Sequence, residues 1–250
     1  MQEIEFKFQV PVKKRKALQK AFTLLKAEPI HLAAQYFDTA DQTLAKHCIA
    51  IRRRQENDEW KQTFKAVNSA KVLSRLELEF DIAPPETTTL DLDNYKKDYS
   101  AIYKKLKRAL GLPLPTLELL FETNIQRLRI LQDVGNSTVE IALDIGKIFK
   151  EQNSVDIFEI EFELKQGSIE DLIAFIRPWV QKYQLSLDTH SKSDYGLLAV
   201  RQQSYFSAQY QTPLVLNRSS SEVEALQSIV ANCLQHLLPN ASSIARQQYS

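Results

Sequence analysis

The sequence predicts an α+β fold, built as an eight-stranded antiparallel β-barrel tunnel with a charged lumen and outer covering helices. The main observation is a recurrent alternation of charged and apolar residues, first over residues 3–8 and again over 75–80, 140–145 and 159–165. Successive residues of a strand point to opposite faces of a sheet, so each segment has one charged and one apolar face. A second observation is that amphipathic helices are available to cover the apolar faces.

The elements follow in order along the chain. Strands are expected over residues 3–8, 30–38, 48–54, 60–66, 73–82, 117–131, 138–145 and 155–165. Turns at Asn57-Asp58 and over residues 133–136 favour hairpins. Helices are expected over residues 14–26, 101–110, 190–205 and 222–238, with a further helix capped by Ser168 that Pro178 breaks or kinks. Gly111 ends the helix of residues 101–110.

The apolar set of these strands is large enough to form the main core, which leaves the charges in the lumen. Burying so many ions in a dry interior would cost several kcal/mol for each ion, roughly, even after relaxation. The lumen is therefore expected to be wet and open, or filled by a ligand of matching charge. An ordinary sheet or sandwich with solvated charged faces is the alternative. Solvent faces rarely place three glutamates at a period of two, as Glu159, Glu161 and Glu163 do.

Composition excludes several classes of protein. The 250 residues carry a formal net charge of +1, which gives no global reason to expect a nucleic-acid or membrane partner. No apolar run approaches the roughly 20 residues of a membrane helix, and a charged N-terminus argues against a secretory signal, so a cytoplasmic location is expected. Cys48 and Cys233 are expected to be buried, inert thiols. The basic residues of helix 101–110 are expected to be a solvated face.

The charged residues divide into two chemical types. Carboxylates clustered on rigid strands suit a hard divalent cation, because such ions prefer oxygen ligands. Arg52, Arg54 and Lys65 supply the donors that a polyanion, most plausibly a chain of phosphates, would need. A metal with carboxylates and a basic wall is the equipment of phosphoryl transfer. With 5 glycines and no GxxxxGK[ST] sequence, a P-loop is excluded.

These residues resemble a known family, the triphosphate tunnel metalloenzymes, also called the CYTH superfamily. Its N-terminal ExExK motif is present as Glu3, Glu5 and Lys7. The resemblance continues in order with Tyr36-Phe37-Asp38-Thr39, Arg52 and Arg54, Thr63-Phe64-Lys65, Arg75 and Glu77, Arg127, Glu140 and Asp144, Glu159/Glu161/Glu163, and Ser191-Lys192. It covers about residues 1–203, and the inorganic triphosphatase branch is the most similar.

The resemblance implies a role for each matching position. The implied metal ligands for Mg²⁺ or Mn²⁺ are Glu3, Glu5, Asp144, Glu159, Glu161 and Glu163. The implied substrate-binding residues are Lys7, Arg52, Arg54, Lys65, Arg75 and Arg127, and the implied catalytic residues are Lys192, Glu161 and Glu163. Lys192 would lie on a helix plugging one end of the tunnel. Glu77, Glu79, Lys61 and Arg129 share the lumen face and are expected to form structural ion pairs.

The expected activity is metal-dependent hydrolysis of inorganic triphosphate to pyrophosphate and phosphate. A class IV adenylate cyclase and a thiamine triphosphatase are alternatives on the same fold. A module that binds polyphosphate or nucleotides without turnover is an alternative of a different class. Retention of the acidic positions argues against that module, because binding alone needs only the basic residues.

The C-terminal part, residues 204–250, is expected to be a linker and a helix. Residues 220–240 resemble the opening helix of a CHAD domain, which would be truncated or degenerate here. A helix that packs on the tunnel domain is an equally weighted alternative. The sequence leaves the oligomeric state open.

Overall fold

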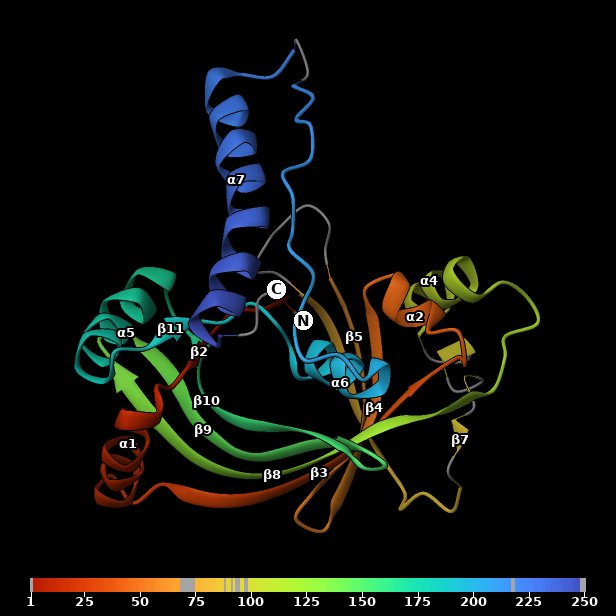
Figure 1. Cartoon of the computed structure of the whole chain (residues 1–250), viewed down its shortest axis with the longest axis horizontal. Coiled ribbons are helices and arrows are strands. Elements are labelled where there is room, and N and C mark those ends of the chain that lie inside the picture. Colours follow the sequence, from red (N-terminus) through yellow and green to blue (C-terminus); the bar gives the residue numbers. More distant parts are fainter. Residues whose placement is uncertain are drawn as a thin grey trace.

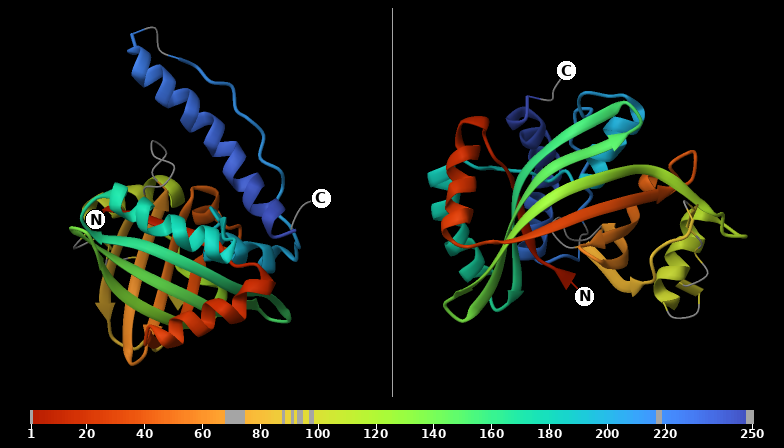
Figure 2. Two further views of the ribbon diagram at one scale, coloured as in Figure 1. Left: turned by 90° about the vertical axis from the view of Figure 1, so that its left-hand side faces the viewer. Right: turned by 90° about the horizontal axis from the view of Figure 1, so that it is seen from below.

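The fold is organised around one antiparallel sheet in a computed structural model that describes residues 2–67, 75–87, 89–90, 92, 95–96, 99–216 and 219–247. The strand order is β1-β6-β5-β4-β3-β8-β9-β10-β2-β11, and β7 pairs with β8 beside this path (Figure 1). The sheet is strongly curved, and helices lie against both of its faces (Figure 2). The α+β class with an antiparallel sheet is confirmed.

The bounds of the strands follow the alternation in the sequence. They are β1 (Gln2–Glu3), β2 (Glu5–Gln9), β3 (Glu28–Asp38), β4 (Ile49–Glu56), β5 (Glu59–Val67), β6 (Arg75–Ile82), β7 (Thr89–Leu90), β8 (Leu117–Val134), β9 (Ser137–Lys150), β10 (Asn153–Gln166) and β11 (Ser186–Leu187). Three of these have two residues each, and the other eight are the expected number. The sheet is not closed, so the predicted barrel is not confirmed. The first strand is interrupted at Ile4, and its two parts pair with different partners: β1 with β6 and β2 with β10.

The bounds of the helices reflect their caps. They are α1 (Val12–Leu24), α2 (Thr43–Lys46), α4 (Ser100–Leu110), α5 (Ile169–Tyr183), α6 (Lys192–Arg201) and α7 (Glu222–Ala245). Ser168 caps α5 as expected, and α4 ends at Gly111, whose φ of 80° suits glycine. Pro178 does not break α5, which runs on to Tyr183. The short α2 was not predicted, and α7 continues past Pro239.

Two apolar cores cover the outer face of the sheet. In the first, Phe8, Ile141 and Phe162 pack with α1 and α5. In the second, Ile51 and Phe64 pack with α2 and α4. The two pairs of helices lie at opposite ends of the molecule, with α6 between them (Figure 1). The expected placement of the apolar strand faces beneath outer helices is therefore observed.

A third core occupies part of the inner, concave face, which the sequence predicted to be a charged lumen throughout. Leu32, Tyr36 and Phe121 from the middle of the sheet pack there against Tyr195 and Leu198 of α6. The helix needs a surface on which to bury its own apolar side, and the middle strands supply it. The inner face is therefore charged on either side of an apolar centre.

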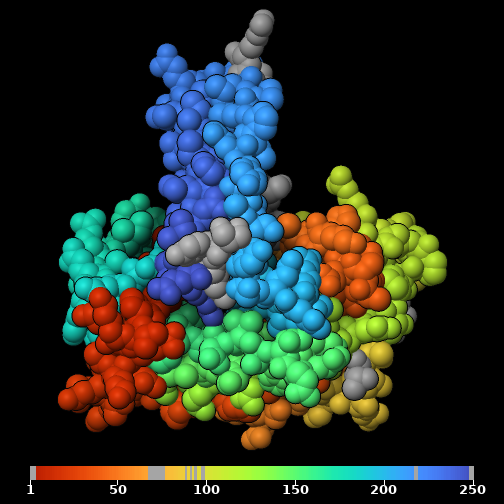
Figure 3. Space-filling model, viewed as in Figure 1, coloured from red at the N-terminus to blue at the C-terminus, as the bar shows by residue number. Residues whose placement is uncertain are grey.

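α7 projects from the body, with the extended chain of residues 207–216 beside it (Figures 2 and 3). Asn232 and Asn240 of α7 bond Thr212 and Gln209 of this extended chain. Cys233 is exposed on α7, and Cys48 is exposed on the turn after α2, so the expectation of buried thiols is wrong for both. Among the described residues, no helix combines the length and hydrophobicity that crossing a membrane requires.

Candidate metal and phosphate site

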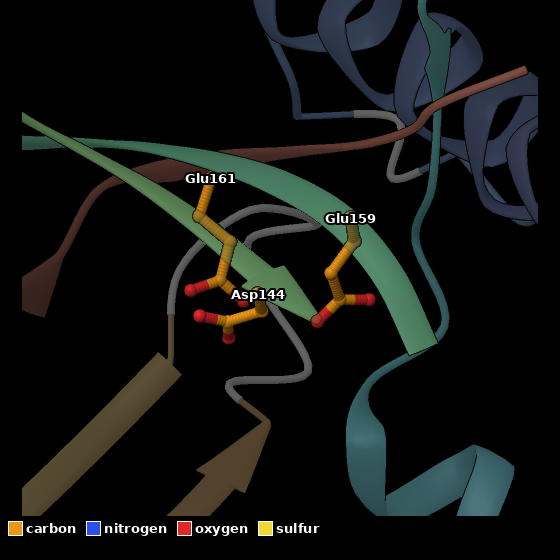
Figure 4. Close-up of side chains that lie close together, drawn as sticks. All are labelled: Asp144, Glu159 and Glu161. Atoms are coloured by element: carbon orange, nitrogen blue, oxygen red, sulfur yellow. The ribbon is translucent and has the colours of Figure 1, made fainter. Parts of the chain in front are cut away.

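Three carboxylates converge on the inner face where β9 meets β10. Asp144 lies directly opposite Glu159 in the strand register, and Glu161 follows two residues later on the same face. Each offers an oxygen within 4.8 Å of the other two (Figure 4). Asp144 and Glu159 are almost fully buried. We call the inner-face carboxylates of β9 and β10 the acidic wall. They are Glu140, Asp144, Glu159, Glu161 and Glu163.

Two cations bridge this cluster. The Lys192 ammonium lies 2.7 Å from Asp144 Oδ2, 2.5 Å from Glu159 Oε1 and 2.9 Å from Glu161 Oε1. Arg127 of β8 lies opposite Asp144 of β9. It donates to both oxygens of the Asp144 carboxylate at 2.7 Å and to Glu161 Oε2 at 2.5 Å. Lys192 is the first residue of α6, whose start is fixed by a capping box of Ser191 and Asp194.

The proton affinities of these groups reflect burial and opposite charge. Burial alone would raise the pKa of Asp144 and Glu161, but Arg127 and Lys192 hold the pKa of each below its ordinary value. Burial dominates at Glu159 and raises its pKa despite Lys192 and Lys7. Burial opposes the charge of Lys192, and the three carboxylates nevertheless raise its pKa well above its ordinary value. The cluster is therefore a set of ions that stabilise one another, except that Glu159 ionises less readily than an ordinary glutamate.

Arg52 and Arg54 on β4 and Lys65 on β5 form a second charged surface, which we call the basic wall. Arg54 contacts Glu79 at 3.2 Å and Glu56 at 3.3 Å, and Lys65 contacts Glu77 at 2.7 Å. Arg52 differs: its described hydrogen bonds go to the neutral Thr63 and Tyr36 hydroxyls, and among the described residues no carboxylate lies within ion-pair distance of it. Arg52 therefore presents a charge that a phosphate could neutralise.

Strand registers place both walls on the same face of the sheet. Arg52 lies opposite Tyr36, which lies opposite Phe121, and Phe121 shares the face of Arg127 on β8. Burial raises the pKa of the Tyr36 phenol, but Arg52, Lys192 and Lys65 together bring that pKa below its ordinary value. The Tyr36 hydroxyl is therefore within electrostatic reach of both walls.

Lys7 links the acidic wall to the turn before α6. Its ammonium lies 3.4 Å from Glu159 and 3.9 Å from Asp188, and it donates to the His190 carbonyl. Burial lowers the pKa of Lys7, but Glu159 and Asp188 raise it above its ordinary value. Lys7 is only 6% exposed. It therefore holds carboxylates in place in the described arrangement.

The predicted site residues fall into groups. Asp144, Glu159, Glu161, Lys192 and Arg127 come together, and Lys7 adjoins them. Arg52, Arg54 and Lys65 form the basic wall. Glu5 and Glu163 lie opposite each other on β2 and β10, one step beyond the cluster, and Lys165 bonds Glu163 at 2.8 Å. The side chains of Glu3 and Arg75 lie outside the part of the chain that the structure describes.

The secondary predictions can also be placed. Glu79, Lys61 and Arg129 form ion pairs, as expected. Arg53, which strand alternation predicts to point outward between Arg52 and Arg54, lies on the outer face, over the Phe37 ring. The basic residues of α4, which are Lys104, Lys105, Lys107 and Arg108, are exposed. The two faces of β4 thus separate Arg53 from its neighbours, as strand alternation requires.

Sequence reasoning missed Asp188 altogether. It is 4% exposed and accepts from the Tyr195 hydroxyl at 2.8 Å. Nothing in its local sequence distinguishes it from a loop aspartate. Tyr36 entered only through the family resemblance, although the alternation of β3 carries the signal that could have assigned it to a face.

The residues present fit a divalent cation. The cluster supplies only carboxylate oxygens, which hard cations prefer. Both carboxylate oxygens of Glu159 are buried and lack a hydrogen bond of acceptable geometry, although Lys192 and Lys7 are near. A cation bound here would share these oxygens with the two ammonium groups, because Lys192 lies 2.5 Å from one Glu159 oxygen and Lys7 lies 3.4 Å from the other.

Comparisons with known proteins agree on the family. Residues 1–194 match the CYTH domain. An inorganic triphosphatase of Haemophilus influenzae is 32% identical over 206 residues, covering 79% of this chain and 55% of the relative. The chain therefore spans about half the length of that relative. The family match ends at residue 194 and gives no support to the predicted CHAD-like segment.

Solved structures share the fold at low sequence identity. A protein from Bacillus halodurans, described as a candidate adenylate cyclase, is 21% identical with a TM-score of 0.51, covering 76% of this chain and 94% of its own. A protein from Hippeastrum, described as a candidate adenylyl cyclase with a dominant triphosphatase activity, is 19% identical with a TM-score of 0.53, covering 80% of this chain and 96% of its own. These likenesses concern the fold alone.

Proposed function

We propose that this chain, which belongs to the CYTH domain family, hydrolyses inorganic triphosphate to pyrophosphate and phosphate with the help of Mg²⁺ or Mn²⁺. The single observation that carries the proposal is the convergence of Asp144, Glu159 and Glu161 on the same face as the basic wall. The triphosphatase relative supports the choice of substrate. A cytoplasmic location is part of the proposal.

In this proposal the acidic wall holds the cation. Asp144, Glu159 and Glu161 are the first ligands, and the resemblance adds Glu163, Glu5 and Glu3. The bound cation would supply positive charge at the phosphoryl oxygens and lower the pKa of a water molecule. Arg127 holds Asp144 and Glu161 in a fixed orientation through its three charge-assisted hydrogen bonds.

The basic wall binds the phosphate chain. Arg52 contributes a guanidinium that a phosphate can engage without displacing a carboxylate, whereas Arg54 must exchange Glu79 for phosphate. Lys65 adds a point charge, and Arg75 is a further proposed contact. Lys192, at the start of α6, would position the attacked phosphorus or the water, since its ammonium contacts all three carboxylates of the cluster.

The proposal also includes a tunnel, in which the sheet encloses the site. β1 and β2 are separated only by Ile4, yet they pair with β6 and β10, which lie near opposite ends of the strand order. A continuous N-terminal strand would join those two ends and enclose the inner face. The proposed assignment of residues 1–203 to the tunnel domain, with a CHAD-like start beyond it, belongs with this part of the proposal.

The test is a product assay on the whole chain. Triphosphate, ATP and thiamine triphosphate are each offered with Mg²⁺, Mn²⁺ or EDTA, and the products are identified. We expect pyrophosphate and phosphate from triphosphate, and none with EDTA. Cyclic AMP from ATP would establish the cyclase instead, and preferred cleavage of thiamine triphosphate would establish that alternative. Binding without any product would favour a sensor.

A further inference from the structure

The last turn of α7 is built into the body of the protein beside β2 and β11. Ser242 is fully buried, and its Oγ accepts from the Thr189 amide at 3.1 Å. The same hydroxyl can donate its one proton to Leu187 O at 3.2 Å or to Leu238 O, in its own helix, at 2.9 Å. Gln9 of β2 donates to the Ser242 carbonyl at 3.0 Å.

Arg246 makes a second attachment one turn later. Its guanidinium stacks over the Tyr195 ring, with 4.1 Å to the ring centroid, and donates to the Asp156 carbonyl at 2.5 Å. Tyr195 belongs to α6 and donates to Asp188. Both attachments therefore reach the turn of residues 187–190 or the α6 residue that bonds it, and each has a further hydrogen bond, to β2 or to β10.

That turn shapes the surroundings of Lys7. β11 pairs with β2 through Ser186 and Leu187, and the Asp188 amide continues this pairing by donating to the Lys7 carbonyl at 2.8 Å. The Asp188 carboxylate and the His190 carbonyl both lie at the Lys7 ammonium. Thr189, whose amide donates to Ser242, is the residue between them.

Lys7 connects the turn of residues 187–190 to the acidic wall. Its ammonium contacts Glu159, the carboxylate whose oxygens are buried without a hydrogen bond of acceptable geometry. We propose that Ser242 and Arg246 are positioning residues: through the 187–190 turn and Lys7, they hold Glu159 in the orientation that the cation site requires. The helix beyond the family match would then be part of the working site.

A neighbouring serine provides a matched control. Ser243 is buried like Ser242, but its described hydrogen bond goes only to Pro239 O, inside its own helix. Replacing either serine by alanine should lower the stability of the helix. Only the replacement of Ser242 should disturb the geometry of the site, because only that hydroxyl reaches the turn.

The experiment compares Ser242→Ala, Ser243→Ala and Arg246→Gln in the whole chain. Mn²⁺ affinity is measured by calorimetry, Thr189 amide exchange by NMR, and kcat and KM with triphosphate. The kinetic measurement rests on the proposed function, whereas the first two do not. Ser242→Ala should weaken Mn²⁺ binding about tenfold, at the low end for residues that orient metal ligands. It should lower kcat to a similar extent, with little change in KM, because the basic wall is untouched.

The outcomes separate positioning from stability. Arg246→Gln should produce the same changes to a smaller extent, Arg246→Lys should restore part of the loss, and Ser243→Ala should match wild type in Mn²⁺ affinity and kcat. Equal effects of Ser242→Ala and Ser243→Ala would overturn the inference. So would faster Thr189 exchange with unchanged Mn²⁺ affinity. If wild type does not cleave triphosphate, the proposed function fails, while Mn²⁺ affinity and amide exchange still decide the coupling.

Discussion

The acidic and basic walls share one face of one sheet but differ in how their charges are neutralised. In the acidic wall, Lys192 and Arg127 each serve several carboxylates, and the central groups are nearly buried. In the basic wall, Arg54 shares Glu56 and Glu79 with Lys61, Lys65 pairs with Glu77, and Arg52 bonds neutral hydroxyls. The acidic wall is thus internally bridged, whereas the basic wall retains a cation, Arg52, whose described hydrogen bonds go to neutral groups and on which Glu77 and Glu79 act only at longer range.

This difference has a physical consequence for each wall. Deep ions that share partners are costly to disturb singly, because removing one partner leaves another charge buried. The pairs of the basic wall are partly exposed, at 15–29% of each side chain, so solvent screening weakens them and they exchange partners more readily. Changes in the acidic wall should therefore affect both stability and activity, and changes in the basic wall should affect substrate binding.

The largest expected effect is on stability and comes from Lys192→Met. Without this ammonium, three carboxylates lose a shared partner at a site where Lys192 is only 13% exposed. Breaking a buried ion pair costs about 3–5 kcal/mol. The free energy of unfolding in EDTA, from urea denaturation, should fall by that amount. Added Mn²⁺ should raise the melting temperature of the variant more than that of wild type. An unchanged stability would show that the acidic wall is solvated.

Next is Glu161→Gln, which tests the acidic wall as a catalytic surface. Glu161 accepts from Lys192 and Arg127 and is one of the three converging carboxylates. Loss of its charge should lower metal-dependent turnover by about a hundredfold or more while the fold, measured by circular dichroism, is kept. Glu163→Gln, one step beyond the cluster, should have a smaller effect. Equal losses would extend the site to Glu163, and unchanged activity of Glu161→Gln would remove Glu161 from it.

For the basic wall, Arg52→Ala should raise KM for triphosphate by about tenfold, the expected loss of a charge-assisted contact. Arg54→Ala should raise it less, because Arg54 is already held by Glu79 and Glu56. Arg53→Ala is the matched control, since Arg53 lies on the same strand but on the outer face. Should Arg53→Ala raise KM as much as Arg52→Ala, the assignment of faces would be wrong.

The two walls also show which parts of the fold a sequence can predict. Strand alternation is local, so the charged faces of β4, β9 and β10 and the outward direction of Arg53 follow from the residues themselves. Helix ends at Ser168 and Gly111 carry local cap signals in the same way. The register between strands far apart in the sequence is not local. That Lys7 lies opposite Glu161 follows from the pairing of β2 with β10, which no motif encodes.

Features that depend on contacts between distant elements could not be predicted from the sequence. The apolar centre of the inner face needs α6 to be placed on β3 and β8, and the alternation of β3 does not reveal which side that helix covers. Asp188 acquires its role only when β11 pairs with β2. The exposure of Cys233 depends on how α7 projects from the body. Composition and periodicity describe each element, and these three features arise between elements.

A smaller effect concerns acid sensitivity at the edge of the acidic wall. Burial opposes the charge of Asp188, but Lys7 and bonds from His190 and Tyr195 hold the pKa of Asp188 well below its ordinary value. Because the folded-state pKa is depressed, its contribution is present above the unfolded value of about 3.9 and is lost as pH falls toward the folded-state value. Asp188→Asn should therefore reduce the drop in stability between pH 6 and pH 3, measured by urea denaturation, by about 1 kcal/mol. An identical drop would show that Asp188 is not the sensitive group.

The smallest expected effect has the opposite sign and comes from Glu79→Gln. Burial raises the pKa of Glu79, but Arg54 and Arg52 lower it below its ordinary value, so the side chain is an anion within the wall that is meant to receive phosphate. Glu79 accepts from Thr63 and Arg54, and it is 29% exposed, which weakens the pair by solvent screening. Removing its charge should free Arg54 and lower KM for triphosphate by about twofold to threefold at low salt, with the difference shrinking as salt is added. A higher KM would mean that Glu79 orients Arg54 for the substrate and does not compete with it.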